Sequence, residues 1–151
     1  MLNRLQGVFS SLESHDVHYV VIGGIAAVLY GVPRATLDLD ILIEATPENA
    51  DRLLKALEAA GLGTASLTTA KDLLKHEIVV FQDWVRIDVQ TRTPGLLFDQ
   101  AWQNRVVMEY QGQTFSVVSR DDLIASKQAS GREIDLQDVH LLKLDSDRGN
   151  A

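Results

Sequence analysis

The spacing of apolar residues along the chain predicts short strands alternating with helices. Helical spacing in residues 2–14 and 133–144 predicts a helix near each end. Short apolar runs in residues 18–24 and 37–44 predict two buried strands, and two hairpins are expected at 76–91 and 105–119. This order favours an α+β fold, with a mixed, mainly antiparallel sheet flanked by helices.

The clearest helix boundaries come from capping residues. Thr46 is in position to cap a helix with Pro47 at its first position, and Gly61 is expected to end it. Ser119 and Asp122 have capping-box spacing at the start of a further helix. These signals place one helix before the first predicted hairpin and another after the second.

Composition limits the kinds of protein that the chain can be. Its 151 residues predict one domain over residues 1–144, with a disordered tail over 145–151. The chain has no cysteine, so any metal would be held by oxygen or histidine ligands. A net charge of -7 disfavours an extended nucleic-acid surface. No apolar run suits a membrane span or a signal peptide, and we expect a cytoplasmic protein.

Two aspartates in the second predicted strand raise the first question about chemistry. Strand alternation directs Asp38 and Asp40 to one face, with Thr36 and Leu42, and directs Leu37, Leu39, Ile41 and Ile43 to the other. Two carboxylates about 6.7 Å apart would repel by roughly 2.5 kcal/mol at an effective dielectric constant of about 20. They suggest a cation site, although charges on the solvent face of an edge strand are the alternative.

A third aspartate strengthens the cation hypothesis. Asp88 lies in "WVRIDVQT", where alternation places it beside Arg86 and away from the apolar face. Three carboxylates without histidine or cysteine suit Mg²⁺ or Mn²⁺, which bind oxygen ligands and also accept substrate phosphate. We therefore expect phosphoryl or nucleotidyl transfer.

The residues next to these strands include candidates for phosphate binding. Gly23 and Gly24 join a strand to a helix, where free backbone amides can bind phosphate, although a tight packed turn is the alternative. Arg34 and Thr36 precede the aspartates, and Arg34 could bind phosphate or form a salt bridge to Glu44 or Asp38. Lys127 could reach a triphosphate or be an ordinary solvated helix residue.

The order Gly-Gly, Asp-x-Asp and a distant strand aspartate resembles the nucleotidyltransferase superfamily of the DNA polymerase β type. "GGIAAVLYGVPRATLDLDILI" with "DDLIASKQASGREIDLQDV" is similar to small bacterial nucleotidyltransferase-like proteins related to abortive-infection toxins of toxin-antitoxin systems. The resemblance covers roughly residues 18–142.

The resemblance implies a metal-dependent transfer of a nucleoside monophosphate. The two glycines would then hold a nucleoside triphosphate, Asp38 and Asp40 would bind the metals, and Asp88 would help bind the catalytic metal and the attacking hydroxyl. Lys127 would contact the triphosphate. Ile134 stands where relatives often carry a basic residue, which weakens the case for a basic acceptor surface.

Two functions remain open at this stage. The first is an enzyme whose acceptor hydroxyl belongs to RNA, a protein or a small molecule. The second is a noncatalytic nucleotidyltransferase-fold module that pairs with a partner in a toxin-antitoxin-like system. The chain has no obvious acceptor-binding domain, so a second copy or a partner protein could complete the site. A metal-dependent nuclease fits the Gly-Gly turn less well.

Overall fold

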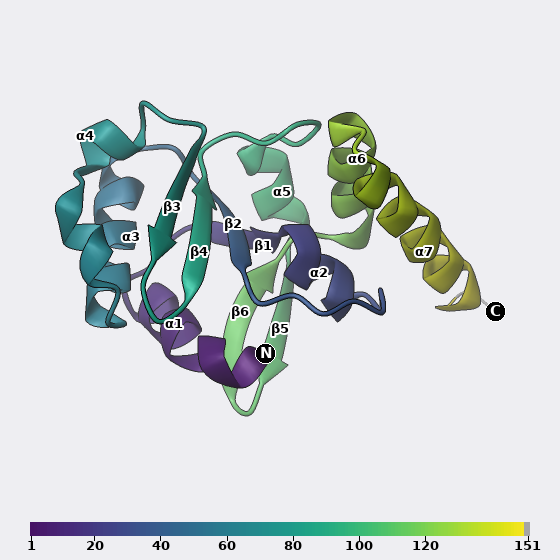
Figure 1. Cartoon of the computed structure of the whole chain (residues 1–151), viewed down its shortest axis with the longest axis horizontal. Helices are drawn as coiled ribbons and strands as arrows, with labels where there is room; N and C mark the ends of the chain where they lie inside the picture. The colour runs from purple at the N-terminus through teal and green to yellow at the C-terminus, as the bar shows by residue number, and fades with distance from the viewer. Residues whose placement is uncertain (150–151) are drawn as a thin grey trace.

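The protein contains a six-stranded sheet surrounded by helices (Figure 1). The structure, a computed structural model, describes the backbone of residues 1–149 and the side chains of residues 1–144. The sheet has the order β3-β4-β2-β1-β6-β5. Its strands are β1 (Tyr19–Ile22), β2 (Leu39–Ile43), β3 (Ile78–Gln82), β4 (Arg86–Gln90), β5 (Val106–Tyr110) and β6 (Gln113–Val117).

Strand pairing confirms the predicted fold class. The pairs β1–β2, β3–β4 and β5–β6 are antiparallel, whereas β1–β6 and β2–β4 are parallel. Both predicted hairpins form, one between β3 and β4 and the other between β5 and β6. The parallel pairing of β2 with β4 matters most for the site, because it sets two aspartate-bearing strands side by side.

The helices lie around the sheet and at its ends (Figure 1). Helix α1 contacts α3 and β6, helix α2 contacts both β1 and β2, and helix α6 contacts α2 and α7. The α6–α7 hairpin lies at one end of the molecule, and α7 extends away from the sheet (Figure 1). The helices are α1 (Leu2–Ser14), α2 (Gly23–Leu29), α3 (Pro47–Ala59), the 3-10 helix η1 (Gly63–Leu67), α4 (Ala70–Leu73), α5 (Phe98–Asn104), α6 (Arg120–Ser130) and α7 (Glu133–Gly149).

The capping predictions are confirmed. The Thr46 hydroxyl accepts a hydrogen bond from the backbone N–H of Asn49, and Pro47 is the first residue of α3. The Ser119 hydroxyl accepts from the backbone N–H of Asp122 at the start of α6. Gly61 has φ +92° just after α3, a conformation that glycine adopts without strain.

Three sequence expectations need correction or completion. Leu37 was expected on the buried face, but β2 begins only at Leu39 and the Leu37 side chain is 68% exposed. The apolar spacing of the last helix rested on Ile134, Leu136, Val139 and Leu142. Val139 and Leu142 are buried, but Ile134 and Leu136 are about half exposed. Helix α7 includes residues 145–149, where the sequence predicted a disordered tail. Residues 150 and 151, also part of that predicted tail, lie outside the described residues.

The buried core explains why β2 can carry aspartates. Leu39, Ile41 and Ile43 are fully buried, and Ile87 and Val89 of β4 are buried with them. This packing fixes the register of β2 and β4, because a slip of one residue would place the aspartates in the core. The opposite face of the two strands is therefore available for polar residues.

None of the helices in the described part of the chain is both long enough and apolar enough to cross a bilayer.

Candidate active site

The centre of the candidate site is a pair of carboxylates on neighbouring strands. Asp40 of β2 lies directly opposite Asp88 of β4 in the parallel register, and the two carboxyl groups are close enough for Asp88 to raise the pKa of Asp40. The two side chains share a face because the strands are in register and have the same alternation. The structure thus brings together two of the three predicted acidic residues.

Burial and the neighbouring carboxylates keep Asp40 from ionising easily. Removal from water is the largest effect, followed by the charge and hydrogen bond of Asp88 and then by Asp38, and together they raise the Asp40 pKa from 3.8 to about 7. Lys127 acts in the opposite direction and lowers it. The pair thus holds a proton near neutral pH, in the place where a cation would relieve the repulsion.

Asp38 is close to this pair but does not face it directly. Its side chain is 52% exposed, and its Oδ2 lies 3.9 Å from Nε of Arg86. Arg86 donates to Asp88 as well, with Nε 2.9 Å from Oδ1 and Nη2 3.4 Å from Oδ2. The Arg86 guanidinium therefore lies between Asp88 of β4 and Asp38, which comes just before β2.

Gly23 and Gly24 lie close to other predicted site residues, Gly23 to Asp40 and Gly24 to Thr36. Gly23 has φ +70°, and a Cβ added to it would collide with Asp40 Oδ2. A Cβ added to Gly24 would lie 3.3 Å from the Thr36 hydroxyl oxygen. The structure supports the tight-turn interpretation for both, and only Gly23 also lines the cavity described below.

Lys127 is buried in a charged cluster and is not solvated. Its side chain is 7% exposed, and Nζ lies 3.3 Å from Asp135 Oδ1 and 2.9 Å from Asp138 Oδ2. Burial opposes the ionisation of Asp135, but hydrogen bonds from Arg132 and Ser130 and the charge of Lys127 lower its pKa below the ordinary value. The α6–α7 hairpin is therefore held together by ion pairs that are largely removed from water.

Arg34 belongs to the same cluster. Its Nη2 lies 2.6 Å from Asp138 Oδ1, and the Asp138 side chain is only 1% exposed. Arg34 therefore forms a salt bridge, but the predicted partners Glu44 and Asp38 are wrong, since its partner is Asp138 of α7. Thr36 lies against Gly24, and neither Arg34 nor Thr36 lines the cavity.

A cavity of about 460 Å³ lies between the acidic strands and α6. Four of the predicted site residues line it, namely Gly23, Asp40, Asp88 and Lys127. Gln90, Thr93, Ser126 and Ser130 add polar groups to the wall, and Ile78 of β3 adds an apolar one. Asp38, Gly24, Arg34 and Thr36 are outside this lining. A volume of this size is in the range of small-molecule sites.

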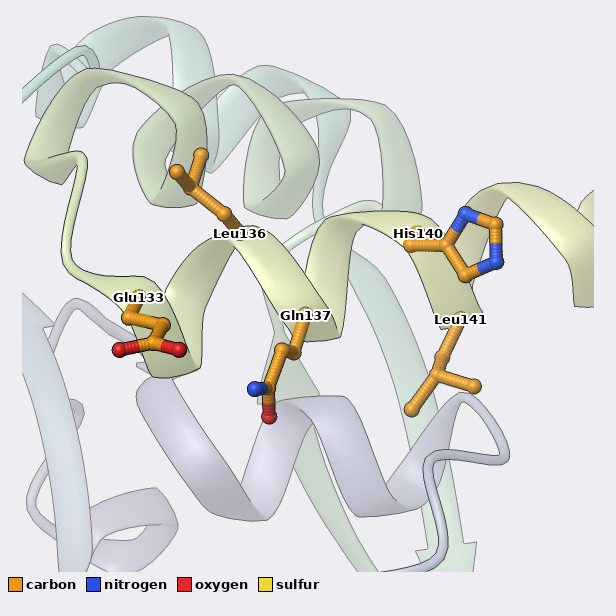
Figure 2. A pocket seen from close by; sticks show the side chains of 5 residues that line it. All are labelled: Glu133, Leu136, Gln137, His140 and Leu141. Carbon is orange, nitrogen blue, oxygen red and sulfur yellow. The ribbon is translucent and has the colours of Figure 1, made fainter.

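A second hollow of about 520 Å³ lies along α7 (Figure 2). Its five lining residues all come from this one helix, and Leu136 projects to the opposite side from Gln137 and Leu141 (Figure 2). The acidic cavity instead combines residues from β1, α2, β2, β4 and α6, and we take it as the candidate active site.

The carboxylate pair fits one divalent cation as part of its ligand set. Among the residues with described side chains, no three His, Cys, Asp or Glu residues are arranged as a metal site. Two adjacent carboxylates nevertheless suit Mg²⁺, which is commonly held by one or two protein carboxylates together with water and substrate phosphate. Asp40 and Asp88 provide that pair, whereas Asp38 is next to Arg86.

The sequence analysis did not identify Asp135 and Asp138 as the ion-pair partners of Lys127 and Arg34. Both lie in the first turns of α7, three residues apart, which places them on one side of the helix. The spacing of two aspartates after Gly131 was available in the sequence. Their partners Lys127 and Arg34 were not, because those contacts depend on how α6 and α7 pack.

The comparisons with known proteins agree with this fold and with the nucleotidyltransferase class. A family model described as "Nucleotidyltransferase of unknown function (DUF6036)" matches residues 2–146, and the chain belongs to that family. A search of curated proteins gave no match. The chain is similar to a crystal structure described as a "putative nucleotidyltransferase" from Thermotoga maritima, with a TM-score of 0.55 and 18% identity over 94% of this chain and 89% of the other.

Proposed function

We propose that the protein transfers a nucleoside monophosphate from a nucleoside triphosphate to a hydroxyl acceptor, with Mg²⁺ or Mn²⁺ bound at the acidic pair. The observation that carries this proposal is the contact between Asp40 and Asp88 inside a cavity that also contains Gly23 and Lys127. Membership of a nucleotidyltransferase family supports the reaction class.

In the proposed reaction, the acceptor oxygen forms a bond to the α-phosphorus while the bond from that phosphorus to the bridging oxygen breaks. Pyrophosphate leaves, and Asp88 accepts the hydroxyl proton. A bound divalent cation would stabilise the negative charge on the phosphate oxygens. Asp88 is suited to this role because its side chain is 18% exposed, so an acceptor can reach it.

The basic side of the cavity would bind the triphosphate. Lys127 lines the cavity, and its Nζ is positioned by two carboxylates of α7. Its donors are partly used by these partners, so we expect it to contribute mainly through its charge. We expect the backbone at Gly23 to come close to phosphate, since the residue has no side chain.

The test compares label transfer by the wild type and by Asp88→Asn. Each α-labelled nucleoside triphosphate is incubated with the protein, Mg²⁺ or Mn²⁺ and a cell lysate, and labelled products are separated. Loss of a general base slows a reaction by about 10² to 10⁴-fold. Asp88→Asn should therefore transfer at least about 100-fold more slowly, with nucleotide binding and melting temperature retained.

A matched control removes an aspartate far from the cavity. Asp51 on α3 is exposed and pairs only with Lys55 four residues later, so Asp51→Asn should transfer at the wild-type rate. Equal rates for wild type and a folded Asp88→Asn would remove Asp88 from the mechanism. If the wild type labels nothing in any lysate, the noncatalytic binding module becomes the better explanation.

The labelled product would also identify the acceptor as RNA, protein or small molecule. A role in a toxin-antitoxin system and a partner subunit at the cavity stay predictions from the sequence resemblance.

A further inference from the structure

Arg86 occupies a position in the acidic site for which the proposed reaction has no use. The parallel register pairs Asp40 with Asp88, whereas Arg86 is the preceding outward residue of β4 and Asp38 lies just before β2 begins. One guanidinium therefore contacts two carboxylates, those of Asp88 and Asp38, and lies close enough to a third, Asp40, to feel its charge. The charges of Asp88, Asp38 and Asp40 all raise the pKa of Arg86, with the hydrogen bond to Asp88 as the largest effect.

The contacts of Arg86 involve the oxygen atoms that a metal would need. Nε and Nη2 contact the two oxygens of Asp88, and Nε also lies 3.9 Å from Asp38 Oδ2. A forked contact of this kind is matched to carboxylate geometry. A divalent cation at the pair would displace at least part of this contact, and it would lie close to a fixed positive charge.

We propose that Arg86 is a built-in counter-cation that holds the carboxylates together in the metal-free protein and weakens the binding of a free divalent cation. The inference extends the proposed function, because it concerns the same cation site. A nucleoside triphosphate brings negative charge with its metal, and its phosphate oxygens can accept the hydrogen bonds of the guanidinium, so Arg86 leaves the carboxylates more readily with nucleotide present than with the metal alone. Arg86 is thus a positioning residue that favours joint binding of metal and nucleotide.

The test is a calorimetric titration of the chelator-treated full-length protein with Mn²⁺ alone, without nucleotide. Arg86→Gln keeps a polar side chain but removes the charge. A unit charge roughly 6 Å from a divalent ion, at the dielectric constant of water, changes the ion's affinity about tenfold. Arg86→Gln should therefore bind Mn²⁺ about tenfold more tightly than the wild type.

A second arginine supplies the control for net charge. Arg92 lies just after β4, and its Nη2 is 3.1 Å from Glu77 Oε1 in an exposed pair. Arg92→Gln makes the same change in net charge at an exposed side chain that does not line the cavity and contacts neither Asp40 nor Asp88, so its Mn²⁺ affinity should equal that of the wild type. An equal gain in both variants would show a general charge effect and would overturn the inference.

Thermal melting gives a readout that does not depend on activity. In chelator, Arg86→Gln should melt below the wild type, because Asp88 and Asp38 lose the guanidinium that contacts them. Saturating Mn²⁺ should raise its melting temperature by more than it raises that of the wild type. If Arg86→Gln does not fold, Arg86→Lys is titrated instead. Its flexible ammonium can leave the carboxylates, so its Mn²⁺ affinity should exceed that of the wild type.

The outcomes separate this inference from the proposed function. Equal Mn²⁺ affinity in the wild type and the Arg86 variant, or no Mn²⁺ binding by either, would overturn the inference. Tighter binding by the variant, together with no label transfer by the wild type, would support the inference and remove the enzyme proposal. Label transfer by the wild type, together with unchanged Mn²⁺ affinity in the variant, would support the enzyme proposal and overturn the inference.

Discussion

Substituting Asp40 by asparagine should stabilise the metal-free protein, and by more at high pH than at low pH. The Asp40 pKa is raised from 3.8 to about 7, mainly by burial and then by Asp88. The folded protein therefore holds a proton on the Asp40–Asp88 pair that the unfolded chain releases near pH 4. As pH rises from about 4 to 7, wild-type stability falls, and above pH 7 the full cost of the ionised pair remains.

The magnitude follows from the two pKa values. At about 1.4 kcal/mol per pH unit, the interval from 3.8 to about 7 corresponds to a cost of about 4 kcal/mol at pH 8. About 1.5 kcal/mol of this cost is already present at pH 5, since the unfolded chain is by then ionised. The gain from Asp40→Asn should thus grow by about 2 to 3 kcal/mol between pH 5 and pH 8.

The assay is urea denaturation of the wild type and Asp40→Asn in chelator at pH 5 and pH 8. Taking the difference between the two proteins at each pH cancels the histidines and other shared groups. Asp51→Asn serves as the control, because it makes the same chemical change at an exposed residue on α3. A gain from Asp40→Asn that is the same at both pH values would refute the reasoning, because it would mean that the pair holds no extra proton. Mg²⁺ should restore wild-type stability at pH 8.

Three further substitutions test packing around the site by urea denaturation. Lys127→Met should cost about 3 to 5 kcal/mol, because it leaves buried carboxylates without their cation, whereas the exposed helix pair lost in Lys55→Met should cost about 0.5 kcal/mol or less. Gly23→Ala should destabilise the protein by more than Gly112→Ala, since both glycines have positive φ but only Gly23 has a neighbouring side chain within 4 Å. Gly95→Ala should also destabilise the protein by more than Gly112→Ala does, because a Cβ added to Gly95 would collide with α6. Equal losses within any of these pairs would count against the packing described.

Most of the fold could be predicted because its signals are local. Capping by Thr46 and Ser119 depends on residues within three positions, and the strands follow from short apolar runs. Leu37 shows where this reasoning fails. Its alternation matches that of β2, but the pairing of β1 with β2 starts opposite Asp40, and Leu37 is left 68% exposed. Alternation alone does not show where a strand begins.

In the candidate site, too, local patterns predicted some features, whereas others depend on how distant segments pack. The shared face of Asp40 and Asp88 follows from alternation on two strands, and the sequence analysis found it. The sequence does not show that these strands are parallel neighbours in register, which is what brings the two carboxylates into contact. The partners of Lys127 and Arg34 depend on the packing of α7 against α6, so local patterns could not predict them.

The charges on the two sides of the cavity are consistent with a metal-bound triphosphate in one orientation. On the sheet side, Asp38, Asp40 and Asp88 face a single cation, Arg86, and the fully ionised group has a formal excess of two negative charges. On the α6–α7 side, Lys127, Arg34 and Arg132 are paired with Asp135 and Asp138, and three cations against two carboxylates leave an excess of one positive charge. A divalent cation is thus favoured at the strands and phosphate toward α6. Because Lys127 is held in place by the buried carboxylates of Asp135 and Asp138, its charge is positioned before any ligand arrives, and the triphosphate would not have to reorganise it on binding.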